Sequence, residues 1–249
     1  MSAVRAVTAI ATRELRSLFL QPLAWVVMTA LLLLNGLVFW NALAIFNLQG
    51  LPSSELVRFI FESLLFWLPL LIALPVIAMR LIAEERQSGT IETLLTTPVT
   101  ETQVVVGKYA AALLFFVVLW TPLLAFVGLV EYYGDVDWRA AGSGFLGLVL
   151  TGGFLLSAAL CASALTRNQI VAAVIGFVLV FGLFVLPLLA GFQAEGGPYE
   201  SLFRHMDLYT AISEFARGIV RTSRVVYTVT GAAFFLFVAA RLMEAFKGQ

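Results

Sequence analysis

Six long runs of apolar residues, separated by short polar segments, dominate the hydrophobic pattern of the chain. A helix needs about 20 apolar residues to cross the roughly 30 Å hydrocarbon core of a bilayer, where water cannot satisfy backbone polar groups. Each run approaches or exceeds that length, and the last is the shortest. We therefore predict an all-α membrane protein, one domain over residues 1–249, with transmembrane helices at 23–46, 59–82, 104–130, 142–165, 169–191 and 225–240.

Two further segments show helical periodicity without the length of a span. Residues 1–22 predict an interfacial helix, because apolar residues recur every three or four positions opposite polar ones. The expected apolar face comprises Val4, Val7, Ala11, Leu15 and Leu18. A similar pattern lies in the external loop expected at 192–224, where a short amphipathic helix either caps the bundle or dips into it. Its expected apolar face comprises Leu208, Ile212, Phe215 and Ile219.

The distribution of positive charge orients these spans. Six is an even number, so both termini lie on one side of the membrane. With the predicted boundaries, that side holds nine Lys and Arg residues and the other side holds six. The first span is preceded by three arginines, and cytoplasmic loops are enriched in Lys and Arg. We therefore expect a multi-pass protein whose two termini are cytoplasmic.

Composition agrees with this class and excludes several others. The chain is 61% hydrophobic and 12% charged, with a formal net charge of zero. The sequence has no block of Lys and Arg, so we expect no nucleic-acid partner. A single Cys and a single His exclude a disulfide framework and a clustered His/Cys metal site.

The predicted spans also lack the residues that most membrane chemistry requires. Their central positions carry no ionisable side chain, and Glu62, Arg80 and Lys108 fall near span ends, where we expect them to reach the interface. This pattern disfavours proton-relay pumps and intramembrane hydrolases. A phosphate-binding loop is missing as well, because Thr102 and Tyr109 occupy positions around Lys108 that such a loop gives to Gly and to Ser or Thr. We expect no catalytic, cofactor-binding or metal site, and ATP, if used, must be hydrolysed by another chain.

The segment EERQSGTIETLLTTPVTETQVVVGK, residues 84–108, places six charged side chains between the second and third spans. Gly89 favours a helix break, and Pro98 ends the short amphipathic helix expected between them. Thr100 and Gln103 have the spacing of a capping box that would begin the third span. From this pattern alone, a loop resting on lipid headgroups and a helix that docks a partner remain equally acceptable for residues 84–100.

The sequence of residues 84–108 resembles a family signature. The pattern "EER…GT-[IL]-E-x-LL…P-[VI]" occurs in permease subunits of type-2 ATP-binding-cassette (ABC) exporters, between the second and third of six spans. This chain carries EER at 84–86, SGTIE at 88–92, LL at 94–95 and PV at 98–99. Near the carboxyl end, ISEF at 212–215, RGIV at 217–220 and VY at 226–227 resemble the gliding-motility and copper-maturation-like branch.

The resemblance implies a coupling helix that contacts ATPase subunits, with Glu92 as the buried contact. The residues to which it gives an ATPase-coupling role are Glu84, Glu85, Arg86, Gly89, Thr90, Ile91, Glu92, Leu94, Leu95 and Pro98. It also implies two ATPase subunits that hold ATP and Mg, a second permease chain, and a place in the bacterial cytoplasmic (inner) membrane.

An unassisted facilitator is disfavoured, because the spans lack polar groups and detectable internal repeats. Three other functions remain open at this level. The chain exports a substrate, relays force to a periplasmic or accessory partner without transport, or acts as a scaffold that binds a protein other than an ATPase. Spans rich in Phe, Leu and Val suit an amphiphilic or lipid-like cargo better than a small metal ion, for which the bundle lacks ligands.

Overall fold

The computed structural model describes residues 3–52, 55–89, 100–189 and 205–247. Every regular element within these ranges is a helix. The helices are α1 (Ala3–Leu20), α2 (Pro22–Gln49), α3 (Leu56–Glu62), α4 (Leu64–Ala78), α5 (Ala83–Gln87), α7 (Glu101–Tyr133), α8 (Trp138–Leu165), α9 (Gln169–Leu189), α11 (Leu208–Ala216) and α12 (Thr222–Lys247).

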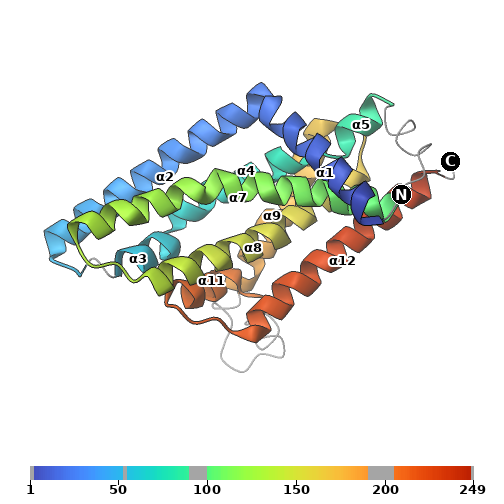
Figure 1. The fold of residues 1–249 in the computed structure, drawn as a ribbon. Helices are drawn as coiled ribbons and strands as arrows, with labels where there is room; N and C mark the ends of the chain where they lie inside the picture. Colours follow the sequence, from blue (N-terminus) through green and yellow to red (C-terminus); the bar gives the residue numbers. More distant parts are fainter. Residues whose placement is uncertain (1–2, 53–54, 90–99, 190–204, 248–249) are drawn as a thin grey trace.

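The long helices form an elongated bundle whose N- and C-termini lie at the same end, which we call the terminal end (Figure 1). Helices α3 and α11 lie at the opposite, far end. Six helical segments are long and apolar enough to cross a membrane, which confirms the expected all-α bundle of six spans. They are Pro22–Gln49, Leu65–Gln87, Glu101–Tyr132, Trp138–Leu165, Gln169–Pro187 and Thr222–Ala245.

Helix α8 forms the centre of the bundle and packs against α4, α7, α9, α11 and α12. Residues 151–164 of this helix are all buried. Small residues permit the close contacts, since a Cβ atom added at Gly152 would lie 2.2 Å from Cζ of Phe116 on α7. Glycine therefore lets the two helix backbones approach closely, as is common in membrane bundles.

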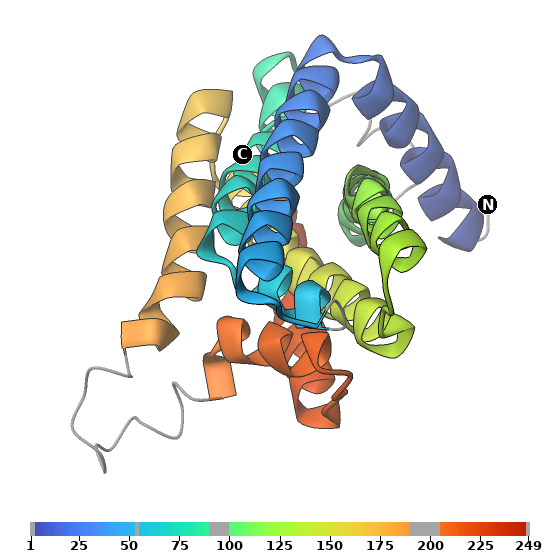
Figure 2. The ribbon, with the colours of Figure 1, turned by 90° about the vertical axis from the view of Figure 1, so that its left-hand side faces the viewer.

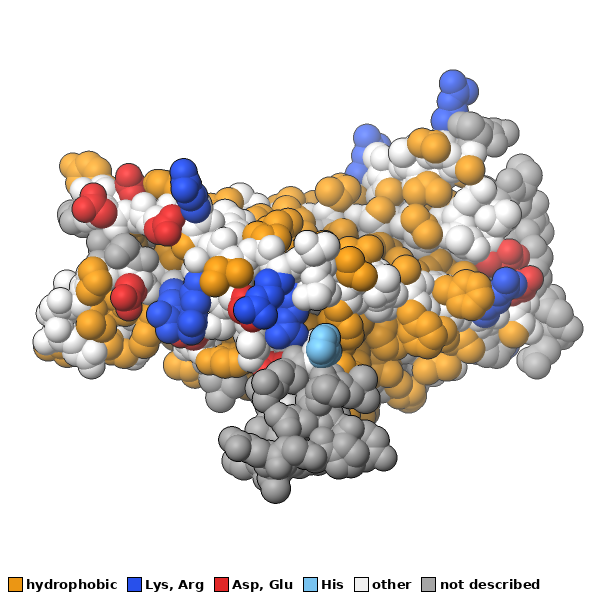
Figure 3. Space-filling view, turned by 90° about the horizontal axis from the view of Figure 1, so that it is seen from below, with side chains coloured by type: hydrophobic (Ala, Val, Ile, Leu, Met, Phe, Trp, Pro, Cys, Tyr) orange, Lys and Arg blue, Asp and Glu red, His pale blue; other side chains and the backbone are white. Residues whose placement is uncertain are grey.

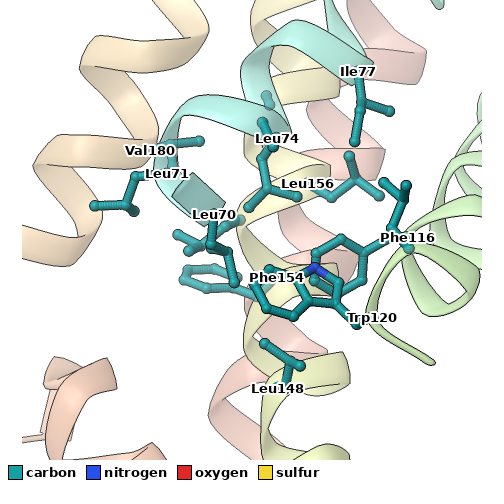
Figure 4. Packing of buried hydrophobic residues seen from close by; sticks show 14 of the residues in the cluster. Leu70, Leu71, Leu74, Ile77, Phe116, Trp120, Leu148, Phe154, Leu156 and Val180 are labelled. Carbon is teal, nitrogen blue, oxygen red and sulfur yellow. The ribbon is translucent and has the colours of Figure 1, made fainter. Parts of the chain in front are cut away.

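Aromatic and aliphatic side chains fill the space between α8 and its neighbours (Figure 4). The Phe66 and Trp120 rings lie 4.9 Å apart, and Trp67 lies at the same distance from Phe184 on α9. Such aromatic contacts stabilise a core beyond the area that they bury.

The outer faces of the spans are apolar. Leu33, Leu37 and Trp40 on α2 are each more than 60% exposed. On the face shown in Figure 3, a band of hydrophobic side chains lies between the charged side chains of the far half and those at the terminal end. This distribution suits a hydrocarbon layer between two polar surfaces.

The second predicted span, 59–82, is not one helix. Ser63 is extended (φ −71°, ψ 126°) and separates α3 from α4. The carbonyls that α3 leaves unpaired at its end accept hydrogen bonds from side chains: Trp67 Nε1 donates to Phe61 O at 3.0 Å, and Tyr209 Oη donates to Glu62 O at 2.9 Å. These two bonds, one local and one from a residue far away in the chain, stabilise a break that continuous hydrophobicity does not reveal.

The predicted apolar face of α1 is confirmed in part. Leu18 is buried and Val7, Ala11 and Leu15 are half-buried, but Val4 is 72% exposed, and the other buried residues are Ala6 and Ile10. Helix α1 packs along α7 at the side of the bundle (Figure 2), and the buried face is rotated from the one expected. Glu14, which lies in phase with Ile10 and Leu18, forms an ion pair with a buried lysine on α7.

At the far end, α11 packs into the bundle rather than lying over it. Leu208, Ile212 and Phe215 are buried as predicted, but Ile219 lies beyond the helix and is 47% exposed. A Cβ atom added at Gly147 of α8 would lie 2.7 Å from Cβ of Phe215, so a glycine on α8 admits this helix.

Candidate functional site

The turn that leads into residues 84–100 is fixed to the central helix, α8, by one serine. Helix α4 ends at Ala78, well before Gly89, and a turn over residues 79–82 leads into α5. Ser163 Oγ on α8 accepts hydrogen bonds from the amides of Ile82 (3.3 Å) and Ala83 (3.1 Å), and it donates to Met79 O (3.0 Å). A single buried hydroxyl therefore satisfies backbone groups at both ends of the turn.

Arg86 makes a second attachment to α8. Its Nη1 donates a 2.6 Å hydrogen bond to the carbonyl of Ala164, in the last turn of that helix. A guanidinium at the C-terminus of a helix complements the partial negative charge there. Arg86 and Ser163 together fix α5 to the terminal end of α8.

Glu85 connects α5 to two other helices. Its Oε1 lies 2.9 Å from Lys108 Nζ on α7 and 3.1 Å from Arg13 Nη2 on α1. Lys108 Nζ also lies 3.3 Å from Glu14 Oε1 on α1. These four side chains, Arg13, Glu14, Glu85 and Lys108, form what we call the charge cluster. It joins α1, α5 and α7.

Lys108 has no exposed surface, contrary to the expectation that it reaches the interface. The Glu14 and Glu85 side chains are only 14% and 17% exposed. A buried charge requires a partner of opposite sign, and Lys108 has two. The sequence of the third span does not indicate these partners. Glu14 was a usable signal, because an isolated acid in phase with the apolar positions of α1 suggests a buried partner of opposite charge.

Gly107 lets α1 reach this cluster. A Cβ atom at this position would lie 2.9 Å from Cγ2 of Ile10 and 3.2 Å from the carbonyl oxygen of Val7. Any larger residue would therefore push α1 away from α7 at the level of Lys108.

The two ends of the predicted coupling segment are well defined. Helix α5 ends at Gln87, where the Ser88 amide donates to Glu84 O at 2.9 Å, and Gly89 has a φ of +73° that favours glycine. At the other end the predicted capping box is confirmed, because Thr100 and Gln103 exchange side-chain-to-backbone hydrogen bonds.

The predicted coupling residues fall partly within the described ranges. Glu84, Glu85, Arg86 and Gly89 are described, and Glu84 is half-buried on α5. Outside the described residues lie Thr90, Ile91, Glu92, Leu94, Leu95 and Pro98.

A second polar network, at the far end, was not predicted from the sequence. Glu62 Oε1 accepts hydrogen bonds from Arg58 Nε (3.0 Å) and Arg217 Nη2 (3.2 Å), and also from Ser213 Oγ. Burial opposes ionisation of this carboxyl, but the hydrogen bonds outweigh burial and hold the pKa of Glu62 below its ordinary value of 4.5. The network fixes α3 against α11, which are 140 residues or more apart in the chain.

Neither polar network has the composition of a reaction centre. Within the described ranges, no group of three or more His, Cys, Asp and Glu side chains is placed to hold a metal ion. The charge cluster and the bonds to α8 instead fix the position of one short segment relative to three helices.

Comparison with known proteins assigns the chain to a family. The family model described as ABC-2 family transporter protein matches residues 20–183, about two thirds of the chain. A search of curated proteins gives no match. The matched region includes the first four spans, most of the fifth, and the segment between α5 and α7. The chain therefore belongs to the ABC-2 family of transporter proteins and is a multi-pass permease of an ABC transporter.

Proposed function

We propose that this permease couples ATP hydrolysis by separate ATPase subunits to export of an amphiphilic substrate, and that residues 84–100 form the coupling element. The observation that carries the proposal is the attachment of α5. This helix leads directly into the segment and is bonded to α8 through Arg86, to α7 through Lys108 and to α1 through Arg13. A displacement of the segment would therefore be transmitted to α1, α7 and α8.

The proposed mechanism is a switch between two packings of the bundle. ATP binding closes two partner ATPases, and their closure displaces the coupling segment because docking differs between the two states. Displacement of α5 passes to α8 through Ser163 and Arg86. Since α8 contacts most of the other spans, its movement repacks the bundle.

The side of the membrane follows from this assignment. The ATPases and their ATP and Mg are cytoplasmic, so the terminal end of the bundle faces the cytoplasm. The predicted excess of Lys and Arg on that side supports the same orientation in a bacterial inner membrane.

A groove at the far end supports an amphiphilic cargo. It has a volume of about 560 Å³ and lies between α2 and α7. Among the described residues that line it, Asn47 supplies an amide and most of the others are apolar, such as Phe39, Leu43 and Phe46. An apolar groove open to the outer part of the membrane suits an acyl chain or similar group.

The complete transporter in this proposal contains two ATPase subunits and a second permease chain. The assignment to the gliding-motility and copper-maturation-like branch rests on residues 212–227, which lie beyond the matched region 20–183. That assignment stays a prediction.

Charge reversal at Glu92 tests the coupling element. The permease is purified with its ATPase, and assembly and ATP turnover are measured for wild type and Glu92→Arg. We expect the variant to fold but to lose most of its bound ATPase or most of its permease-dependent turnover.

A matched control is Glu244→Arg, since Glu244 is an exposed acid on α12 at the same end of the bundle, 57% exposed. Its assembly and turnover should match those of wild type. Full assembly and turnover in Glu92→Arg would remove Glu92 from the mechanism, whereas a bound partner without ATPase activity would favour the scaffold function.

A further inference from the structure

One face of α1 is exposed and takes no part in the packing of this helix against α7. Ile10 and Glu14 face α7, which fixes the rotation of the helix about its axis. The exposed side presents Arg5, Thr12 and Arg16, which recur at intervals of 7 and 4 residues and so form one stripe.

This stripe borders a shallow groove at the elbow between α1 and α2. The groove has a volume of about 880 Å³ and is lined by Arg5, Arg13, Arg16, three hydroxyl side chains and the elbow residues Gln21 and Pro22. No acidic side chain of the described residues lines it. The groove is therefore strongly basic, which favours an anion.

Two of the three arginines are available to a ligand. Arg13 is already paired with Glu85. Within the described part of the chain, neither Arg5 nor Arg16 has a hydrogen-bond or ion-pair partner, and both are exposed. They lie about 16 Å apart along the helix axis, too far to share one small anion.

The elbow places the groove at the edge of the membrane. Helix α2 is the first span and begins at Pro22. Next to the groove, Leu20 is 82% exposed and Trp25 is 57% exposed, and the Trp25 indole donates a 2.9 Å hydrogen bond to Phe19 O. An amphipathic aromatic ring beside an exposed Leu is typical of the boundary between hydrocarbon and headgroups.

We propose that the stripe on α1 is a binding site for anionic phospholipid headgroups, with Arg5 and Arg16 each engaging one phosphate. A guanidinium matches a phosphate in charge and in planar hydrogen-bonding geometry. The site goes beyond the coupling function, since it requires only the full permease in a membrane and no ATPase.

Lipid binding to the purified full-length protein in mild detergent tests this site. Native mass spectrometry measures the dissociation constant of phosphatidylglycerol and, separately, of phosphatidylcholine. We expect Arg5→Gln and Arg16→Gln each to weaken phosphatidylglycerol binding about fivefold and the double variant to combine the two losses, because each arginine contributes about equally at a charged lipid surface. Phosphatidylcholine binding should not change.

Arg139→Gln serves as the matched control, since Arg139 is an exposed arginine near the start of α8 at the far end. It should bind both lipids as wild type does. Unchanged phosphatidylglycerol binding in the double variant would overturn the proposal, as would an equal loss for both lipids. Displacement of phosphatidylglycerol by inorganic phosphate at matched concentration would also overturn it, in favour of a site for free phosphate.

Discussion

Lys108 on α7 and Glu85 on α5 form an ion pair of 2.9 Å, in which the lysine side chain has no exposed surface. The pair joins the third span to the segment that precedes the predicted coupling element. Glu14 adds a contact from α1 to the same ammonium group. In the proposed function the charge cluster transmits movement of α5 to α1 and α7. Breaking it should lower the stability of the folded protein.

Lys108→Met should destabilise the protein strongly. Methionine keeps the bulk of the side chain but removes the cation that Glu14 and Glu85 share. Glu85 keeps Arg13, whereas the largely buried Glu14 loses its ion pair with Lys108, and an orphaned buried charge costs about 3 kcal/mol. The measurement is the free energy of unfolding or the melting temperature in detergent.

The triple variant Glu14→Gln/Glu85→Gln/Lys108→Met separates charge from packing. It should recover a large part of the lost stability, because no buried charge of the cluster remains unpaired; Arg13 also loses Glu85 but is 59% exposed. Equal instability of the single and triple variants would show that packing, and not the ion pair, explains the effect.

Gly107→Ala should loosen α1 from α7. The added Cβ would contact Ile10 and the Val7 carbonyl at 2.9 to 3.2 Å, and overpacking of this kind costs about 1 to 3 kcal/mol. Gly128→Ala is the control on the same helix, since nothing lies within 4 Å of a Cβ there. Thermal stability should fall for the first variant and stay the same or rise for the second; similar values would contradict the close approach of α1.

The number and order of the spans were predictable from the sequence, because the length of an apolar run is a local property of the chain. Local signals also gave the Thr100 capping box and the break near Gly89. The break at Ser63 was not predictable, since it depends on Tyr209, which lies far away in the chain. The partners of Lys108 were hidden for the same reason: they lie on α1 and α5, and only the packing of these helices brings the charges together.

Ser163→Ala should weaken the attachment of α5 to α8. The substitution leaves the Ile82 and Ala83 amides and the Met79 carbonyl without this partner, and unsatisfied buried groups cost about 1 to 3 kcal/mol. Permease-dependent ATP turnover should fall with stability, because the same bond transmits movement in the proposed mechanism.

Ser157→Ala is the matched control on α8. Ser157 is also buried, but its hydroxyl bonds only to Phe154 O in its own helix. Both variants lose a buried hydroxyl, so equal losses of turnover would argue against a transmitting role for Ser163.

Acid should selectively weaken the far-end network around Glu62. The pKa of Glu62 is lowered in the folded protein, so its contribution to stability is fully present above the ordinary value of 4.5 and is lost as pH falls through the folded pKa. Melting temperatures of wild type and Glu62→Gln should therefore differ most at neutral pH and converge below 4.5.

Glu244→Gln is the reference variant for this pH series, because its carboxylate is exposed and pairs with an exposed arginine. Its melting temperature should follow that of wild type at every pH. A gap between wild type and Glu62→Gln that stays constant as pH falls would contradict the role of ionised Glu62.

We expect this permease to work with a separate ATPase, and co-purification from the native host is the decisive experiment. The tagged protein is extracted in mild detergent, and the chains that remain bound are identified by mass spectrometry and assayed for ATP hydrolysis. We predict that a chain with a phosphate-binding loop co-purifies and hydrolyses ATP. Stable recovery of a partner that lacks such a loop, with no associated ATP hydrolysis, would contradict the account.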